Sequence, residues 1–179
     1  MLILAIGGSG SGKSEYAEQL TVHLAGAMPR YYLATMQVWD EECRARIEKH
    51  RRQRAGRGFV TVERPLDLAG MKSITLDKGG TILLEDLGNL AANEFYAPGR
   101  TLHQTEEIIL AGIRKLYGLG RHLVIVSNEV GTGGSNYAGE TEQYLRLLGK
   151  LHQELAGQAD AVCEVVAGLP SYYKGRNPL

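Results

Sequence analysis

The sequence predicts an α/β fold with three layers, in which helices cover both faces of a mostly parallel central sheet. Short apolar runs alternate along the chain with stretches of helical periodicity, and a glycine-rich loop connects the first apolar run to the first helical stretch. Strands that are joined through helices pair in parallel by right-handed crossovers, which places helices on both faces of the sheet.

Six short segments have the composition of strands, and most are continuously apolar, as buried strands are. They cover residues 2–6, 31–35, 59–63, 81–84, 123–126 and 161–166. Helical spacing or composition predicts helices over residues 13–24, 40–54, 89–96, 102–116 and 140–156. We expect the proline-containing tail after Gly168 to be irregular.

Length and charge limit the possible classes of protein. A chain of 179 residues with 44% hydrophobic residues can bury one core but is short for two, so we expect one domain over residues 1–179. Lysine plus arginine and aspartate plus glutamate both number 20, so long-range attraction gives no reason to expect a nucleic-acid or membrane partner.

The cysteines and the apolar runs indicate the compartment. Cys43 and Cys163 are far apart and belong to no CxxC or Cys/His cluster, which favours two buried thiols in a reducing environment. The apolar run at the N-terminus is too short for a signal peptide, and no later run reaches membrane-spanning length. We therefore expect a cytoplasmic protein without membrane insertion.

The glycine-rich loop matches the phosphate-binding pattern GxxxxGK[ST]. Its residues are Gly7, Gly8, Ser9, Gly10, Ser11, Gly12, Lys13 and Ser14. In such a P-loop the glycines let backbone amides turn toward the phosphates, the lysine reaches them as a point charge, and the serine hydroxyl binds Mg²⁺. A dinucleotide-binding loop would instead need GxGxxG and an acidic residue after the second strand, where this chain has Ala34 and Thr35.

A P-loop site also needs a carboxylate at the end of a neighbouring strand to hold Mg²⁺ directly or through water. Glu85 and Asp86 follow the apolar run at residues 81–84 and supply it, with Glu85 preferred. The alternative is a pair of exposed loop acids. Ser14 and Glu85 are thus the candidate metal ligands.

A basic stretch after the second strand contains a histidine. Arg46, His50 and Arg54 are spaced i, i+4 and i+8, so a helix would place them along one stripe. The cationic neighbours would keep His50 neutral and available as a nucleophile at phosphorus. A solvated helix face explains the same pattern; a nucleic-acid patch over residues 49–57 is disfavoured because no aromatic residues interleave it.

Several segments together resemble the bifunctional adenosylcobinamide kinase / adenosylcobinamide-phosphate guanylyltransferase family of the cobalamin pathway. They occur in the family's order over about three quarters of the chain. The matching parts are residues 7–14, 33–35 with Asp40 and Glu42, Arg46-Ile47 with His50 and Arg51, and residues 61–63, 83–85 and 126–131.

The resemblance implies two reactions at one nucleotide site. In the first, the cobinamide side-arm hydroxyl attacks the γ-phosphate of ATP or GTP, with Lys13 and Mg²⁺ neutralising charge. In the second, His50 attacks the α-phosphate of GTP, and the resulting GMP-histidine transfers GMP to adenosylcobinamide phosphate. The family is generally oligomeric, so a homo-oligomer is expected.

The resemblance also implies nucleotide contacts outside the P-loop. They are Ala34, Thr35, Met36, Arg51, Arg52, Gln53, Arg54, Glu63 and Glu85. The Glu63 carboxylate could accept both the N1–H and the exocyclic N2–H of guanine, a pair that adenine lacks. An ordinary acid at the end of a strand is the alternative for Glu63.

The chain departs from the family pattern after residue 131. The family has a proline-containing loop and an arginine-rich helix there, whereas this chain has Thr132-Gly133-Gly134-Ser135-Asn136 and then Glu142, Leu145-Arg146 and His152. Two alternatives to the bifunctional enzyme therefore stay open. One is a kinase that lacks guanylyl transfer, and the other is a GTP-binding regulatory protein, which would be expected to carry an Asn/Thr-Lys-x-Asp motif that the sequence lacks.

Overall fold

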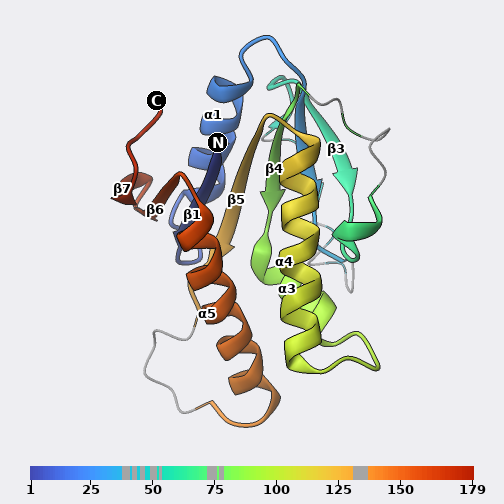
Figure 1. Cartoon of the computed structure of the whole chain (residues 1–179). Coiled ribbons are helices and arrows are strands. Elements are labelled where there is room, and N and C mark those ends of the chain that lie inside the picture. Colours follow the sequence, from blue (N-terminus) through green and yellow to red (C-terminus); the bar gives the residue numbers. More distant parts are fainter. Residues whose placement is uncertain are drawn as a thin grey trace.

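A seven-stranded sheet forms the centre of the fold (Figure 1). The computed structural model describes all residues except 38–40, 42–43, 45–46, 49–51, 53, 72–75, 77–78 and 131–136. The strands are β1 (Leu2–Gly7), β2 (Arg30–Ala34), β3 (Phe59–Glu63), β4 (Thr81–Glu85), β5 (His122–Asn128), β6 (Ala161–Val166) and β7 (Leu169–Lys174). Their order across the sheet is β3-β2-β4-β5-β1-β6-β7.

In the described part of the chain, four helices with defined bounds connect the strands, and they agree with the predicted ranges within a few residues. They are α1 (Lys13–Ala25), α3 (Leu87–Phe95), α4 (Leu102–Leu119) and α5 (Glu140–Gln158), with the short 3-10 helix η1 (Leu68–Gly70) after β3. Of the predicted helix over residues 40–54, the described residues Glu41, Arg44, Ile47, Glu48, Arg52 and Arg54 are helical. None of the described helices is long and apolar enough to span a bilayer.

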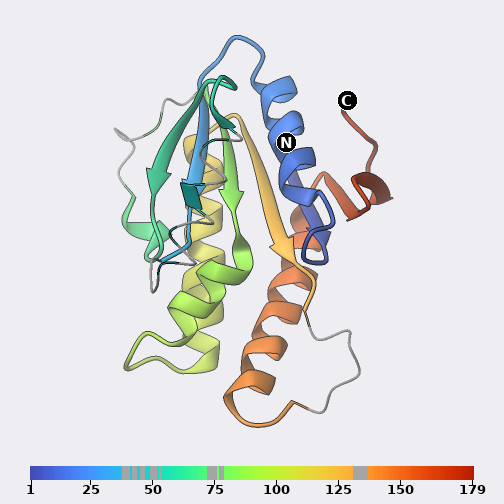
Figure 2. The same cartoon turned by 180° about the vertical axis from the view of Figure 1, so that it is seen from behind.

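The helices lie in two layers, which confirms the predicted three-layer architecture. Helix α1 packs on one face of the sheet, and α3, α4 and α5 pack on the other; Figures 1 and 2 show these faces from opposite sides. Residues of β1 alternate between the two cores: Leu2 and Leu4 face one, and Ile3 and Ala5 face the other. Burial on both faces explains why the strand is apolar at every position.

The C-terminal strand β7 corrects the expectation of an irregular tail. It pairs antiparallel with β6, and Pro170 lies opposite Val165. Proline is tolerated because β7 is an edge strand, where a missing N–H removes no bond inside the sheet. Ala167 and Gly168 both have positive φ and form the tight two-residue turn that joins the strands.

On β6, Cys163 is a buried free thiol as predicted, while Cys43 lies outside the described residues.

The strand order corrects a second expectation. Strand β4, which ends in Glu85, is not adjacent to β1, because β5 pairs with both of them. All three strands are parallel, so their carboxyl ends still lie at the same edge of the sheet. The residues that follow β1, β4 and β5 therefore meet there, in the position where open α/β sheets bind ligands.

His152 connects helix α5 to the carboxyl end of β5. Its Nε2 lies 2.7 Å from the Ser127 hydroxyl, and the ring is half-buried while Ser127 is fully buried. Burial lowers the pKa of His152 from its ordinary value of 6.5, because the charged ring would lose hydration. Burial thus favours the neutral form of the His152 ring in the folded chain.

His152 should make stability depend on pH. The unfolded chain takes up a proton near pH 6.5, whereas the folded chain resists it, so folding stability should fall as the pH drops below about 6.5. His152→Gln cannot take up this proton, so the stability advantage of the original chain over this variant should shrink between pH 7.5 and pH 5.5. Urea unfolding at the two pH values measures the difference in free energy of unfolding between the original chain and the variant. An advantage that is the same at both pH values would contradict the prediction.

Candidate nucleotide-binding site

The glycine-rich loop has the geometry of a phosphate cradle. It follows β1, and α1 begins at Lys13 directly after it. Gly10 and Gly12 have φ values of 71° and 87°, in the left-handed region that favours glycine. Because α1 begins directly after the loop, the unpaired amides of its first turn and the positive end of its dipole lie at the loop, where they attract anions.

The β6–β7 turn supports the loop from behind. The Gly168 N–H donates to the Ser11 carbonyl oxygen at 2.7 Å. A Cβ on Gly12 would lie 2.9 Å from Gly168 Cα, and one on Gly7 would lie 2.6 Å from the Val165 carbonyl oxygen. Glycine at these two positions is required by close backbone approach.

Lys13 and Ser14 direct their side chains to the two sides of the loop. The Lys13 ammonium donates to the Gly8 carbonyl oxygen at 3.0 Å and is almost fully buried. The Ser14 hydroxyl donates to Glu85 Oε1 at 2.6 Å. The two residues predicted as metal ligands, Ser14 and Glu85, thus lie within hydrogen-bonding distance of each other.

Glu85 is a partly buried carboxylate, and only one of its oxygens has a hydrogen-bond partner among the described residues. The oxygen without such a partner is Oε2. Burial, together with the neighbouring Asp86 charge, raises the pKa of Glu85 to about 8. A hard divalent cation prefers oxygen ligands such as Ser14 Oγ and the free Glu85 oxygen. These two side chains therefore fit a metal ion that takes its remaining ligands from phosphate and water.

Asp86 serves the fold more than the ligand. Its Oδ1 accepts from the Asn89 N–H at 2.6 Å, which caps α3, and its Oδ2 accepts from Asn128 at 3.0 Å. Burial still raises its pKa.

Among the described residues, no group of three or more His, Cys, Asp and Glu side chains is arranged to hold a metal ion. Magnesium in P-loop proteins needs only one or two protein ligands, so Ser14 and Glu85 suffice.

A cleft of about 850 Å³ extends from the P-loop across the carboxyl edge of the sheet. The described residues that line it are Ser9 to Glu15, Tyr32, Ala34, Met36, Arg44, Ile47, Glu48, Arg54, Thr61, Glu63, Glu85, Asp86, Asn89 and Asn128. Four strand spacings of about 4.8 Å separate β1 from β3, roughly 19 Å across the sheet. An extended nucleoside triphosphate can span that distance.

The far side of the cleft is built by β2 and β3. Tyr32 pairs in register with Thr61, and Ala34 pairs with Glu63, so the four side chains lie on one face. The Arg54 guanidinium lies 3.3 Å from the centre of the Tyr32 ring. Its Nη1 is buried without a hydrogen-bond partner among the described residues, so it can donate to an anion or a base in the cleft.

The fold brings most of the predicted site residues together. Ser9 to Ser14, Ala34, Met36, Arg54, Glu63 and Glu85 all line the cleft. Thr35 does not line it; the Thr35 hydroxyl bonds instead to the backbone of Glu85 and Asp86. Arg52 is exposed and is not among the lining residues, although it pairs at 3.2 Å with Glu48, which lines the cleft. His50, Arg51 and Gln53 lie outside the described residues.

Several lining residues have no role predicted from the sequence, among them Tyr32, Thr61, Asn89 and Asn128. The period of two along a strand would have indicated Tyr32 and Thr61 from Ala34 and Glu63. Asn128 could be identified only from the register of β5 beside β1, in which it lies opposite Gly7. Asn89 required the path of the chain after Glu85.

Comparison with solved structures confirms the fold. The flagellar accessory protein FlaH from Methanocaldococcus jannaschii matches 98% of this chain and 78% of its own, with a TM-score of 0.51 and 12% identity. A KaiC-like protein from Pyrococcus horikoshii matches 98% and 79%, with a TM-score of 0.53 and 13% identity. At such identities the likeness shows the P-loop NTPase-like fold alone.

Comparison of sequences defines the relationship more narrowly. The chain is 33% identical over 173 residues to the bifunctional adenosylcobalamin biosynthesis protein CobP of Pseudomonas aeruginosa, with 96% of each chain covered. It is 31% identical over 180 residues to the bifunctional adenosylcobalamin biosynthesis protein CobU of Escherichia coli, with 94% of this chain and 97% of the relative covered. A family model described as cobinamide kinase / cobinamide phosphate guanyltransferase matches residues 3–172. Since that match spans nearly the whole chain, the chain belongs to the cobinamide kinase / cobinamide phosphate guanyltransferase family.

Proposed function

We propose that the chain phosphorylates adenosylcobinamide with ATP or GTP and then transfers GMP from GTP to the product, giving adenosylcobinamide-GDP. The observation that carries this proposal is the cleft that joins Lys13, Ser14 and Glu85 on one side to Glu63 on the other. Membership of the family supports the choice of corrinoid substrate. The proposal includes a cytoplasmic homo-oligomer, with neither nucleic acid nor membrane as partner.

The first reaction is a phosphoryl transfer. The substrate hydroxyl oxygen forms a bond to the γ-phosphorus, the bond to the bridging oxygen breaks, and ADP or GDP leaves. Lys13 and the loop amides bind the phosphates and stabilise the charge that develops on them. A Mg²⁺ ion held by Ser14 and Glu85 would neutralise phosphate charge when bound. The chain's own contribution is mainly positioning.

The second reaction uses a histidine nucleophile. A nitrogen of His50 attacks the α-phosphorus of GTP, pyrophosphate leaves, and a phosphorus–nitrogen bond forms. A phosphate oxygen of adenosylcobinamide phosphate then attacks the same phosphorus, and the histidine leaves. The assignment of His50 rests on its match to the family motif. Arg54, which lies nearby in sequence and lines the cleft, supports a basic environment there.

Glu63 is proposed to select guanine. Its carboxylate can accept the N1–H and N2–H of guanine together, an arrangement that adenine cannot offer. Hydrogen bonds to a charged acceptor contribute more than neutral ones, so this pair is sufficient for a clear preference. Arg54 stacked on Tyr32 supplies a further polar donor beside it.

One observation favours a second candidate, a kinase without guanylyl transfer. Helix α5 is arginine-rich in the family, but here its two cationic side chains face carboxylates. Arg146 pairs with Glu142 at 2.6 Å, and Lys150 pairs with Glu106 at 3.5 Å. Cations neutralised in this way attract a substrate phosphate less strongly.

Incubation with GTP and Mg²⁺ should leave one GMP on the protein. We expect the intact mass to increase by one guanylyl group in the original chain and to stay unchanged in His50→Ala, because the attacking nitrogen is gone. Lys13→Ala should reduce the adduct by weakening triphosphate binding. An adduct that persists in His50→Ala would remove this residue from its assigned role, and phosphorylation of the corrinoid without any adduct would favour the kinase alone.

Lys13→Ala should lower kcat/KM for corrinoid phosphorylation by on the order of 100-fold, since a preorganised charge on the transferred phosphate is lost. Arg114→Ala is a matched control, because it removes one cation from an exposed position on α4. Steady-state assays of product formation compare the three proteins. Equal losses in both variants would show that general charge, rather than the loop lysine, matters.

A further inference from the structure

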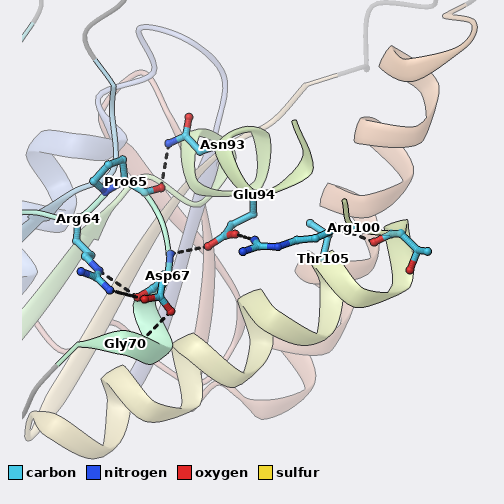
Figure 3. A network of polar contacts seen from close by, with 9 residues as sticks. Arg64, Pro65, Asp67, Gly70, Asn93, Glu94, Arg100 and Thr105 are labelled. Carbon is cyan, nitrogen blue, oxygen red and sulfur yellow. Dashed lines mark hydrogen bonds and ion pairs between the residues drawn. The ribbon is translucent and has the colours of Figure 1, made fainter. Parts of the chain in front are cut away.

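Asn93 on helix α3 connects the chain segments that follow β2 and β3, and it does not line the cleft. Figure 3 shows its bond to Pro65. Its side-chain Nδ2 donates to the Thr35 carbonyl oxygen at 2.8 Å and to the Pro65 carbonyl oxygen at 3.0 Å. Thr35 follows β2 directly, and Pro65 comes two residues after Glu63 at the end of β3. One amide group thus fixes the segments that follow β2 and β3, the two strands that build the side of the cleft proposed to bind the nucleotide base.

Thr35 is also bonded to the end of β4, which carries Glu85 on the side of the cleft proposed to bind the phosphates. The Thr35 N–H donates to the Glu85 carbonyl oxygen at 3.1 Å, and the Asp86 N–H donates to the Thr35 hydroxyl at 2.8 Å. Asp86 in turn caps α3, the helix that carries Asn93. Together with the bonds of Asn93, these bonds fix the position of Glu63 relative to that of Glu85.

A second set of bonds fixes the turn after β3 on α3. Asp67 has a φ of 53°, and its N–H donates to Glu94 Oε1 at 2.6 Å. Glu94 is buried and pairs with Arg100, while Arg64 pairs with the Asp67 carboxylate at 2.7 Å (Figure 3). The segment that begins with Glu63 is therefore fixed to α3 at both Pro65 and Asp67, with Asn93 nearer to the cleft.

We infer that Asn93 is a positioning residue for purine selectivity, which rests on the proposed role of Glu63. Asn93 is not among the residues that line the cleft, so it acts through the backbone of residues 35 and 65. Hydrogen bonds weaken steeply with misalignment, so a small shift of Glu63 reduces the paired contact with guanine. Phosphate binding depends on Lys13 and the loop amides, three strands beyond β2 in the sheet, and is affected much less.

The experiment compares the affinities of GTP and ATP analogues with a non-hydrolysable α–β bridge, which His50 cannot cleave, by calorimetry on the full chain without the corrinoid. Asn93→Ala removes both donors. We expect it to weaken GTP-analogue binding by roughly tenfold, as expected for bonds to a charged group, and to change ATP-analogue binding by no more than about twofold. Asn93→Asp, which keeps the size but not the donors, should give the same loss of selectivity and serves if the alanine variant does not fold.

Thr105→Val is the matched structural control. Thr105 is buried, and its hydroxyl donates to the Thr101 carbonyl oxygen at 3.0 Å within the first turn of α4, away from the cleft. Thr105→Val removes one buried hydrogen bond from a side chain to the backbone, so the melting temperature should fall. The ratio of the affinities for the GTP and ATP analogues should stay unchanged. A ratio that changes equally in Thr105→Val and Asn93→Ala would overturn the inference, because general loosening would explain it.

Glu63→Gln separates this inference from the proposed function. If Glu63→Gln loses the guanine preference and Asn93→Ala keeps it, Asn93 has no positioning role. If Glu63→Gln keeps the preference, or the original chain shows none, the guanine contact itself is wrong and the inference is overturned with it. Loss of preference in both Glu63→Gln and Asn93→Ala, with ATP binding retained, supports the inference.

Discussion

Parallel pairing of strands that are buried on both faces is the constraint on which the site depends. Helices cover both faces of the sheet, so the middles of β1, β4 and β5 are apolar. Most groups that can meet a ligand therefore come from the ends of these strands and from the turns that follow them. The P-loop after β1, Glu85 after β4 and Glu63 at the end of β3 all reach the same edge for this reason.

This arrangement places two carboxylates in a position that is unfavourable without a ligand. Glu85 is partly buried, the adjacent Asp86 is buried, and both have raised pKa values. Asp86 is compensated by the N-terminus of α3 and by Asn128, whereas one Glu85 oxygen has no partner among the described residues. The difference separates a structural acid from one that is available to a cation.

Helix α3 connects the two sides of the site. It begins at the Asp86 cap beside the P-loop and carries Asn93 and Glu94, which fix the segments after β2 and β3. A rigid frame of this kind suits an enzyme that must present different phosphorus atoms of one nucleotide to different attackers, because both reactions need the base and the phosphates in a defined relation.

The sequence by itself determined the features that depend on local interactions. The P-loop, its flanking strand and helix, the acid after β4 and the three-layer fold follow from spacing, glycine positions and apolar runs. Only the tertiary structure decided that β5 lies between β1 and β4, that residues 169–174 form an edge strand, and that Arg54 stacks on Tyr32. It also decided that Asn93 reaches Thr35 and Pro65. These features join residues far apart in sequence, and their hydrogen bonds and packing depend on strand order and register, which no local pattern specifies.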